Sequence, residues 1–447
     1  MALDLDPSKL LDRASELVDR AKAAGATASD AAVVRSRSRS VEVRNGTVEG
    51  TDASETDRIS LRVFVGDKVA SVSADAGDDA RVLAERAVAM AKVSPSDPHA
   101  GLAPKDRLAR DVPDLDLVDE TDVPTAALTE DAKRMEDAAR AVNGVTNSSG
   151  AGAYQGASGL VLVTSDGFSG SYSGTSFGRS VSVVAGQGTG MERDYEMTSR
   201  RHYSELDPAE EVGRRAGERV VKRLGGRKID TTTATVVFEP RVARGLLGTF
   251  TSAINGAAVA RGTTFLKDAM GTPIMPDTVS VTDDPTQPRR GGSRPFDGEG
   301  VRGEKLTLVE NGVLNAWLLS SSIASELGLQ TNGRGARSGS TVRAASTNVA
   351  FSAGDISPED LLREVGTGFF VTEMIGRGAD IVTGDYSRGA SGFWIENGEL
   401  TYPVTEVTVG STLQHMFKEM RLADDLDLRY STAAPTLAIP AMTIAGR

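Results

Sequence analysis

Apolar positions in the first hundred residues follow a helical spacing, then a strand spacing, then a helical spacing again. A period of about 3.6 predicts a helix over residues 7–24. Alternating polar and apolar positions over 31–73 predict antiparallel strands, with Asn45-Gly46 as the signal of a type I′ hairpin turn. Residues 78–93 return to helical spacing. We therefore interpret residues 1–110 as an N-terminal α/β module.

The same order recurs after a segment rich in prolines and acids, which we interpret as a linker (94–124). A helix is predicted over 126–142, Gly- and Ser-rich strands over 150–190, and another helix over 208–224. We interpret residues 120–232 as a second α/β module, and the repeated order favours a diverged duplication.

From residue 233 onward, short strands and Asn-Gly turns dominate the pattern. The charge-free segment 245–260 predicts a central helix, and Asn-Gly pairs at 311–312 and 397–398 predict hairpins. Residues 233–447 therefore read as a β-rich C-terminal domain. The fold class predicted is α+β, with two serial helix–strands–helix modules followed by this domain and its central helix.

Charge and cysteine content exclude several kinds of chemistry. The net charge is -12, so broad nucleic-acid binding is disfavoured, because that function needs a basic surface. The chain has no cysteine, which excludes disulfides, thiolate nucleophiles and thiolate metal ligands. The N-terminal residues have neither the basic start nor the apolar run of a signal peptide, and no segment is long and apolar enough to cross a bilayer. We expect a cytoplasmic protein with no membrane partner.

Zinc hydrolysis needs about three protein ligands, commonly two histidines on one helical face. This chain has three histidines, His99, His202 and His415, and no two of them share a predicted helix. We therefore expect no zinc site built from this chain's own side chains.

Three glycine-rich stretches resemble catalytic or phosphate-binding loops. Residues 174–178 match the G-x-S-x-G nucleophile elbow around Ser176, but a strand pattern follows where the elbow needs a helix. Residues 150–156 and 333–339 lack the context of dinucleotide and phosphate loops, and we interpret both as turns.

Two charged segments leave alternatives open. Arg35, Arg37 and Arg39 share one face of a predicted strand and could bind phosphate or an acidic partner. A solvated strand, or an edge strand protected by charge, is the favoured interpretation. Paired carboxylates in the loop 281–301 could bind metal or act as acid and base. We favour a loop held by salt bridges, because acids and arginines alternate in it: Asp283, Asp284, Asp297 and Glu299 with Arg289, Arg290 and Arg294.

Four stretches together resemble the TldD/PmbA family, peptidase-like proteins also called modulators of DNA gyrase. The most specific is 384–417, where an I-E-N-G turn precedes a Y-P-V strand. The D-D…D-x-E-G loop at 281–301 also fits, as do R-N-G-T-V-E-G at 44–50 and the hairpin at 62–74. Nearly the whole chain is covered by this ordered set.

The resemblance also indicates a branch of the family. The TldD branch carries H-E-x-x-x-H on the helix after the first strand of the last domain. Here the matching positions are Gly248, Thr249 and Ala253, none of which can bind zinc or activate water. The cysteine expected near 373–376 is also missing. These departures match the TldE/PmbA branch.

The resemblance implies a metal-free partner subunit of a cytoplasmic zinc metallopeptidase that degrades small or unfolded peptides. Zinc would be held by a TldD-type subunit carrying H-E-x-x-x-H, in a heterodimer, with a homodimer as the state of the chain alone. Asp385, Tyr386, Ser387 and Arg388 are the candidates for a peptide or interface lining. The alternatives are a self-sufficient serine- or carboxylate-dependent hydrolase and a gyrase- or nucleic-acid-associated regulator.

Overall fold

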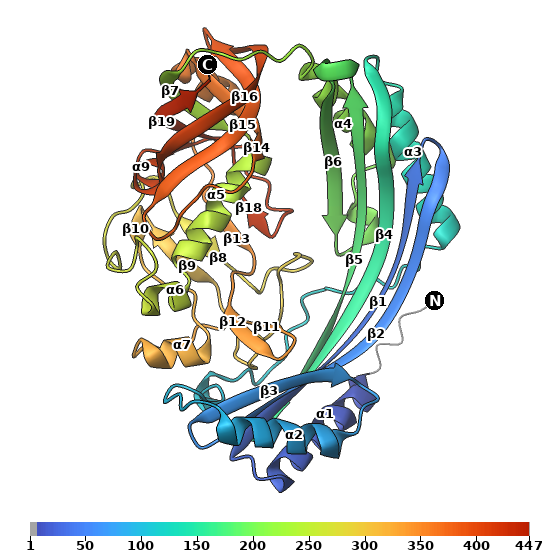
Figure 1. Cartoon of the computed structure of the whole chain (residues 1–447), viewed down its shortest axis with the longest axis vertical. Coiled ribbons are helices and arrows are strands. Elements are labelled where there is room, and N and C mark those ends of the chain that lie inside the picture. Colours follow the sequence, from blue (N-terminus) through green and yellow to red (C-terminus); the bar gives the residue numbers. More distant parts are fainter. Residues whose placement is uncertain (1–6, 447) are drawn as a thin grey trace.

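One long antiparallel sheet forms the N-terminal half of the molecule. The computed structural model describes residues 7–446. Four of the six strands are 17 to 20 residues long and run the length of the molecule in Figure 1. The strand order is β3–β2–β1–β4–β5–β6, with bounds β1 Ala28–Arg44, β2 Thr47–Val65, β3 Lys68–Asp75, β4 Val145–Thr164, β5 Ser169–Ala185 and β6 Glu192–Arg200.

The two sequence modules share this sheet, because β1 of the first pairs with β4 of the second from Asp30↔Thr164 to Val43↔Ala151. The segment predicted as a turn at 150–156 lies inside β4, so that prediction is wrong. Its glycines and small residues sit between two neighbouring strands, where they continue the ladder. The glycine spacing at 150–156 that resembles a dinucleotide loop is therefore explained by a strand rich in small residues.

Two pairs of helices cover one face of the sheet at opposite ends (Figure 1). Ala31 and Val33 of β1 pack in the same core as the first pair, and Val41 and Val43 pack in the same core as the second. Since side chains alternate across a strand, both pairs lie on the same face. These helices are α1 (Pro7–Ala23) with α2 (Ala80–Val93), and α3 (Thr125–Arg140) with α4 (Ala209–Lys222).

Asn-Gly turns connect strands where the sequence predicts them. Asn45 and Gly46 have φ values of 51° and 76°, which is the left-handed conformation that a type I′ turn requires at both positions. Asn311 and Asn397 adopt the same conformation ahead of their glycines. Short 3₁₀ helices lie at Lys105–Arg107, Gly188–Gly190 and Tyr203–Glu205.

The C-terminal half contains a sheet that closes on itself. Its order is β16–β15–β14–β7–β19–β17, and β16 also pairs with β19. A second, five-stranded sheet has the order β10–β9–β8–β13–β18, and β11 pairs with β12. The strands are β7 Thr232–Phe238, β8 Val281–Asp283, β9 Leu306–Glu310, β10 Val313–Leu314, β11 Gly335–Ser338, β12 Thr341–Ala344, β13 Val349–Phe351, β14 Gly368–Ile375, β15 Asp385–Glu396, β16 Glu399–Thr412, β17 Arg421–Leu422, β18 Thr432–Ala433 and β19 Leu437–Ala445.

The central helix differs from the prediction in both position and length. Helix α5 (Pro240–Ala253) begins with proline at its first turn, and α6 (Gly256–Ala260) follows it as a separate helix. The Asn255 side chain accepts a hydrogen bond from the Ala257 N–H and so starts α6 anew. The prediction of one helix over 245–260 is therefore wrong in two respects. The helix begins at Pro240, and the segment is divided into two helices.

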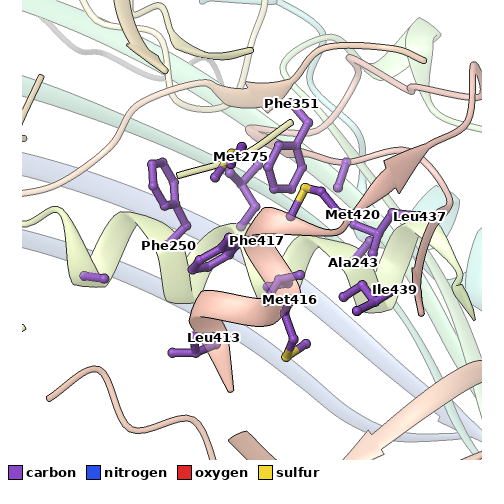
Figure 2. Close-up of a cluster of buried hydrophobic side chains, with 14 of the residues drawn as sticks. Ala243, Phe250, Met275, Phe351, Leu413, Met416, Phe417, Met420, Leu437 and Ile439 are labelled. Carbon is purple, nitrogen blue, oxygen red and sulfur yellow. The ribbon is translucent and has the colours of Figure 1, made fainter. Parts of the chain in front are cut away.

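Helix α5 packs its apolar face into the C-terminal core. Figure 2 shows Ala243 and Phe250 of α5 among side chains of α9 (Leu413–Lys418), including Met416 and Phe417. The Phe250 and Phe417 rings meet edge to face at 5.6 Å. The remaining helices are α7 (Ser321–Glu326) and α8 (Pro358–Val365). Within the described residues, no helix combines the length and apolar character needed to cross a membrane.

A buried ion pair fixes the start of the loop 281–301. Arg334 and Asp283 are both fully buried, and the guanidinium of Arg334 donates to the Asp283 carboxylate through Nε and to the Asp283 carbonyl through Nη2. The Thr347 N–H and hydroxyl donate to the same carboxylate at 2.6 and 2.9 Å. Burial lowers the pKa of Arg334, and Asp283 opposes that shift. The attraction between the two charges thus offsets the free-energy cost of removing each of them from water.

We expect Arg334→Met to lower the free energy of unfolding by about 3–5 kcal/mol, because it leaves the Asp283 carboxylate buried without a cation. Urea unfolding followed by circular dichroism measures the change. The matched control is Arg302→Met, since Arg302 is 68% exposed and pairs with Glu304 at only 3.9 Å. That variant is expected to stay within about 0.5 kcal/mol of the wild type. Equal midpoints for the two variants would contradict the assignment.

Candidate functional site

The three positions that match the zinc motif of the family do not share a surface. Apart from its chain neighbours and the backbone of its own helix, no atom lies within 4 Å of a Cβ built on Gly248, so this position faces open space. The Thr249 hydroxyl donates to the Gly245 carbonyl at 3.0 Å. Ala253 is fully buried in the C-terminal core. A side chain at 253 thus points toward the core, while one at 248 points away from it.

The three histidines lie apart and bond to different partners. His99 Nδ1 lies 3.1 Å from Ser325 Oγ, and His415 Nε2 lies 2.9 Å from the Pro440 carbonyl oxygen. His202 Nε2 lies 2.9 Å from the Asp116 carbonyl oxygen. Across residues 7–446, no three His, Cys, Asp or Glu side chains are grouped so as to hold a metal ion.

Ser176 does not sit on a nucleophile elbow. It lies within β5, paired across the sheet with Gly156 of β4, in extended backbone. The elbow requires a strained strand-to-helix turn that exposes the hydroxyl. This geometry gives no support to the serine-hydrolase alternative.

The predicted lining segment 385–388 begins β15, and alternation divides its side chains between two faces. Tyr386 is 5% exposed in the C-terminal core, and burial raises its pKa to about 12. Tyr386 is therefore a core residue in this structure, and its burial gives no support to the predicted lining role. Asp385 and Ser387 are exposed and Arg388 is partly exposed, so a lining role for these three stays a prediction.

The arginines of β1 share a face as predicted, and their side chains are partly exposed. Because β1 is an interior strand between β2 and β4, the edge-strand half of the interpretation is wrong. The face they share is the one between the two helix pairs. Each arginine is paired with an acid, which reduces the positive charge offered to a phosphate: Arg35 with Asp57, Arg37 with Glu55 and Arg39 with Asp122.

The loop 281–301 is held by ion pairs, although its own arginines are not the partners of its buried acids. Asp283 pairs with Arg334, and Glu299 lies 3.5 Å from Arg62 of β2. Arg289 instead pairs with Asp116 and Glu205. The loop is thus tied to distant parts of the chain.

Asp297 is a buried carboxyl held by backbone amides. Its oxygens accept from the N–H groups of Gly335, Glu299 and Val301 at 2.7 to 2.9 Å. Burial, reinforced by the neighbouring Glu299 carboxylate, raises the pKa of Asp297 to about 6.

Ion pairs of low exposure join the C-terminal half to the first end of the long sheet. Arg337 Nη2 lies 2.8 Å from Asp30 Oδ1, and Arg62 binds the other oxygen of Asp30 at 2.6 Å. Burial alone would raise the pKa of Asp30, but Arg337 and Arg62 hold it below its usual value.

A second group of ion pairs joins the other end of the sheet to the same C-terminal half. Asp194 of β6 binds Arg241 of α5 at 2.8 Å, and Arg223 of α4 pairs with Glu373 of β14. A cavity of about 310 Å³ adjoins them, with Phe370 and other apolar side chains in its wall. Sequence reasoning missed these pairs, because the partners are 47 and 150 positions apart and no local pattern connects them.

Family models of known proteins match the successive parts of this chain. Three family models match in chain order: PmbA/TldA metallopeptidase domain 1 over residues 29–91, the central domain over 118–224 and the C-terminal domain over 231–446. The chain belongs to the PmbA/TldD metallopeptidase family. The predicted family is therefore confirmed.

Relatives with similar sequences cover the whole chain. The metalloprotease PmbA homolog of Haemophilus influenzae is 35% identical over 99% of this chain and 98% of its own length. Metalloprotease PmbA of Escherichia coli O157:H7 is also 35% identical, over 98% of this chain and 97% of its own.

Solved structures confirm the predicted α+β fold. A Bacteroides thetaiotaomicron protein described as a modulator of DNA gyrase has a TM-score of 0.91 and 25% identity, covering 99% of each chain. TldE from Thermococcus kodakarensis has a TM-score of 0.85 and 20% identity, covering 97% of this chain and all of its own. The latter likeness concerns the fold alone.

The raised pKa of Asp297 predicts a pH dependence of stability. An unfolded aspartate ionises near 3.8, whereas this one keeps its proton to about 6. The native state therefore binds the extra proton between these values, and this group's contribution to stability falls as pH rises from about 4 to about 6, by up to about 3 kcal/mol. Relative to Asp297→Asn, the wild type should lose stability across that range in urea unfolding. The exposed Asp268→Asn variant should parallel the wild type, and parallel curves for Asp297→Asn would refute the shift.

Proposed function

We propose that this chain is the metal-free partner subunit of a cytoplasmic TldD/TldE-type zinc metallopeptidase that degrades small or unfolded peptides. The observation that carries the proposal is the outward-facing Gly248 and core-facing Ala253 on α5. A catalytic zinc needs about three ligands aimed at one point. Membership of a metallopeptidase family supports the peptide chemistry, and zinc would come from a TldD-type subunit.

Peptide handling does not require zinc on this chain. An extended peptide gains affinity from backbone hydrogen bonds to strand edges, with little demand on its sequence. The backbone at the start of β15 is already paired, so Asp385 and Ser387 are candidates for contact with a peptide or with the partner subunit through their exposed side chains. The closed strand arrangement behind them provides a rigid support.

Reconstitution tests the proposal directly. The purified chain, incubated with zinc and desalted, should retain no stoichiometric zinc by mass spectrometry and should not cleave an unfolded peptide. Adding a TldD-type chain with an intact H-E-x-x-x-H should produce cleavage that a chelator abolishes. Cleavage by this chain alone that a chelator stops would defeat the proposal.

A paired set of variants separates the roles of the two subunits. Replacing the motif glutamate of the TldD-type chain by glutamine should remove cleavage by at least about a hundredfold, because the general base is lost. Ser176→Ala in this chain should leave the rate unchanged, since Ser176 lies within a paired strand. A large loss of activity in Ser176→Ala would favour the serine-hydrolase alternative instead.

A further inference from the structure

Three arginines from distant parts of the chain gather around the side chain and carbonyl of Tyr430. The Arg244 guanidinium of α5 lies 3.4 Å from the centre of the Tyr430 ring, and that of Arg200, the last residue of β6, lies 5.5 Å from it. Arg290 of the loop 281–301 donates from Nη2 to the Tyr430 carbonyl oxygen at 2.6 Å. We call these three residues the arginine cluster.

The cluster carries more positive charge than its surroundings balance. Within residues 7–446, neither Arg244 nor Arg290 has a carboxylate within 4.0 Å. The nearest acid to Arg200 is Asp207 at 3.6 Å, and Asp207 is already bound by Arg215 at 3.0 Å and Arg429 at 2.9 Å. Asp427 and Asp284 also act electrostatically on Arg290, and Asp427 on Arg200, but the ion pair of Asp427 is with Arg429 at 2.8 Å. Among the described residues, Asp207 is therefore the one carboxylate within 4.0 Å of the cluster, and it is shared.

Several N–H groups of the cluster are buried without a hydrogen-bond partner. They are the Nε atoms of all three arginines and Nη2 of Arg200, which is 7% exposed. Burial lowers the pKa of Arg290, and the neighbouring charge of Arg200 adds to that shift, while the carboxylates of Asp427 and Asp284 oppose it. A buried donor without an acceptor costs stability, and more so when it is charged. Buried arginines elsewhere in this chain, such as Arg62 and Arg334, have carboxylates in contact.

We propose that the arginine cluster binds the terminal carboxylate of a peptide. A guanidinium offers paired N–H donors in the geometry of a carboxylate, and the described chain supplies no acceptor for the unpartnered donors of the cluster. This inference rests on the proposed peptide-handling role and names the part of the peptide that is recognised.

The surroundings of Arg244 favour a peptide chain as the bearer of the carboxylate. Gly248 lies one helical turn after Arg244 on the same face of α5, and Gly245 lies beside it; neither has any atom within 4 Å of a built Cβ. Ser252, a further turn along, is exposed. A backbone can therefore approach α5 closely next to the charge. The net charge of -12 disfavours a nucleic acid as the ligand.

The test is a binding measurement on this chain alone. One unfolded peptide without Asp or Glu is labelled at its N-terminus and prepared with a free carboxylate or a C-terminal amide. Fluorescence anisotropy at fixed low salt should give a Kd about tenfold tighter for the free acid, the effect of one charge-assisted contact. The double variant Arg244→Gln, Arg290→Gln should bind the acid as weakly as the wild type binds the amide.

A matched variant controls for the loss of a stacked arginine. Arg227 lies 3.3 Å from the centre of the Tyr402 ring, and Arg227→Gln should keep the full preference for the free acid. Thermal melting checks that each variant is folded. If the double variant does not fold, Arg290→Gln alone is used for the comparison. Its preference for the free acid over the amide should be reduced at least threefold.

Equal affinity of the wild type for acid and amide would overturn the inference, as would an undiminished preference in the folded variant. Competition by inorganic phosphate at the concentration of the peptide would also overturn it, since the site would then bind any anion. Because no partner subunit and no cleavage are involved, failure here leaves the reconstitution result unaffected.

Discussion

Pairing of β1 with β4 is the constraint on which this architecture depends. It joins two helix–strands–helix modules into one sheet, so neither module has a free edge where they meet. The C-terminal half then bridges the sheet. At one end Arg337 reaches Asp30, and at the other Arg241 reaches Asp194. Buried acids and arginines make these contacts specific, because each partner alone would be a costly buried charge.

Helix α5 has two faces with different surroundings. Its inner face is built from apolar side chains that fill the C-terminal core (Figure 2). Its outer face holds glycines and small polar residues, and Arg244 stands near its start. The inner face is required for folding, whereas the outer face is free to change. Substitutions on the outer face can thus change the groups offered to a ligand while the fold is kept.

Local patterns in the sequence predicted the elements well, and long-range contacts poorly. The Asn45-Gly46 pair predicted its hairpin correctly because the conformation of a two-residue turn is specified by the two residues themselves. The break at Asn255 was missed because it depends on a cap and on a side-chain bond from Asn255 to the distant Ala344 carbonyl. Likewise, the charges of 281–301 were visible in the sequence, but their partners Arg62 and Arg334 were not. Only the folded chain brings such residues together.

The length of the strands has a mechanical consequence. The sheet has strands of 17 to 20 residues, and ion pairs attach both of its ends to the same C-terminal half. Rigid rotation of one half against the other would break buried ion pairs at one end. Smaller deformations can instead be spread as slight bending and twisting along many residues of each strand. A displacement of the C-terminal half on binding would therefore bend the long strands along their whole length.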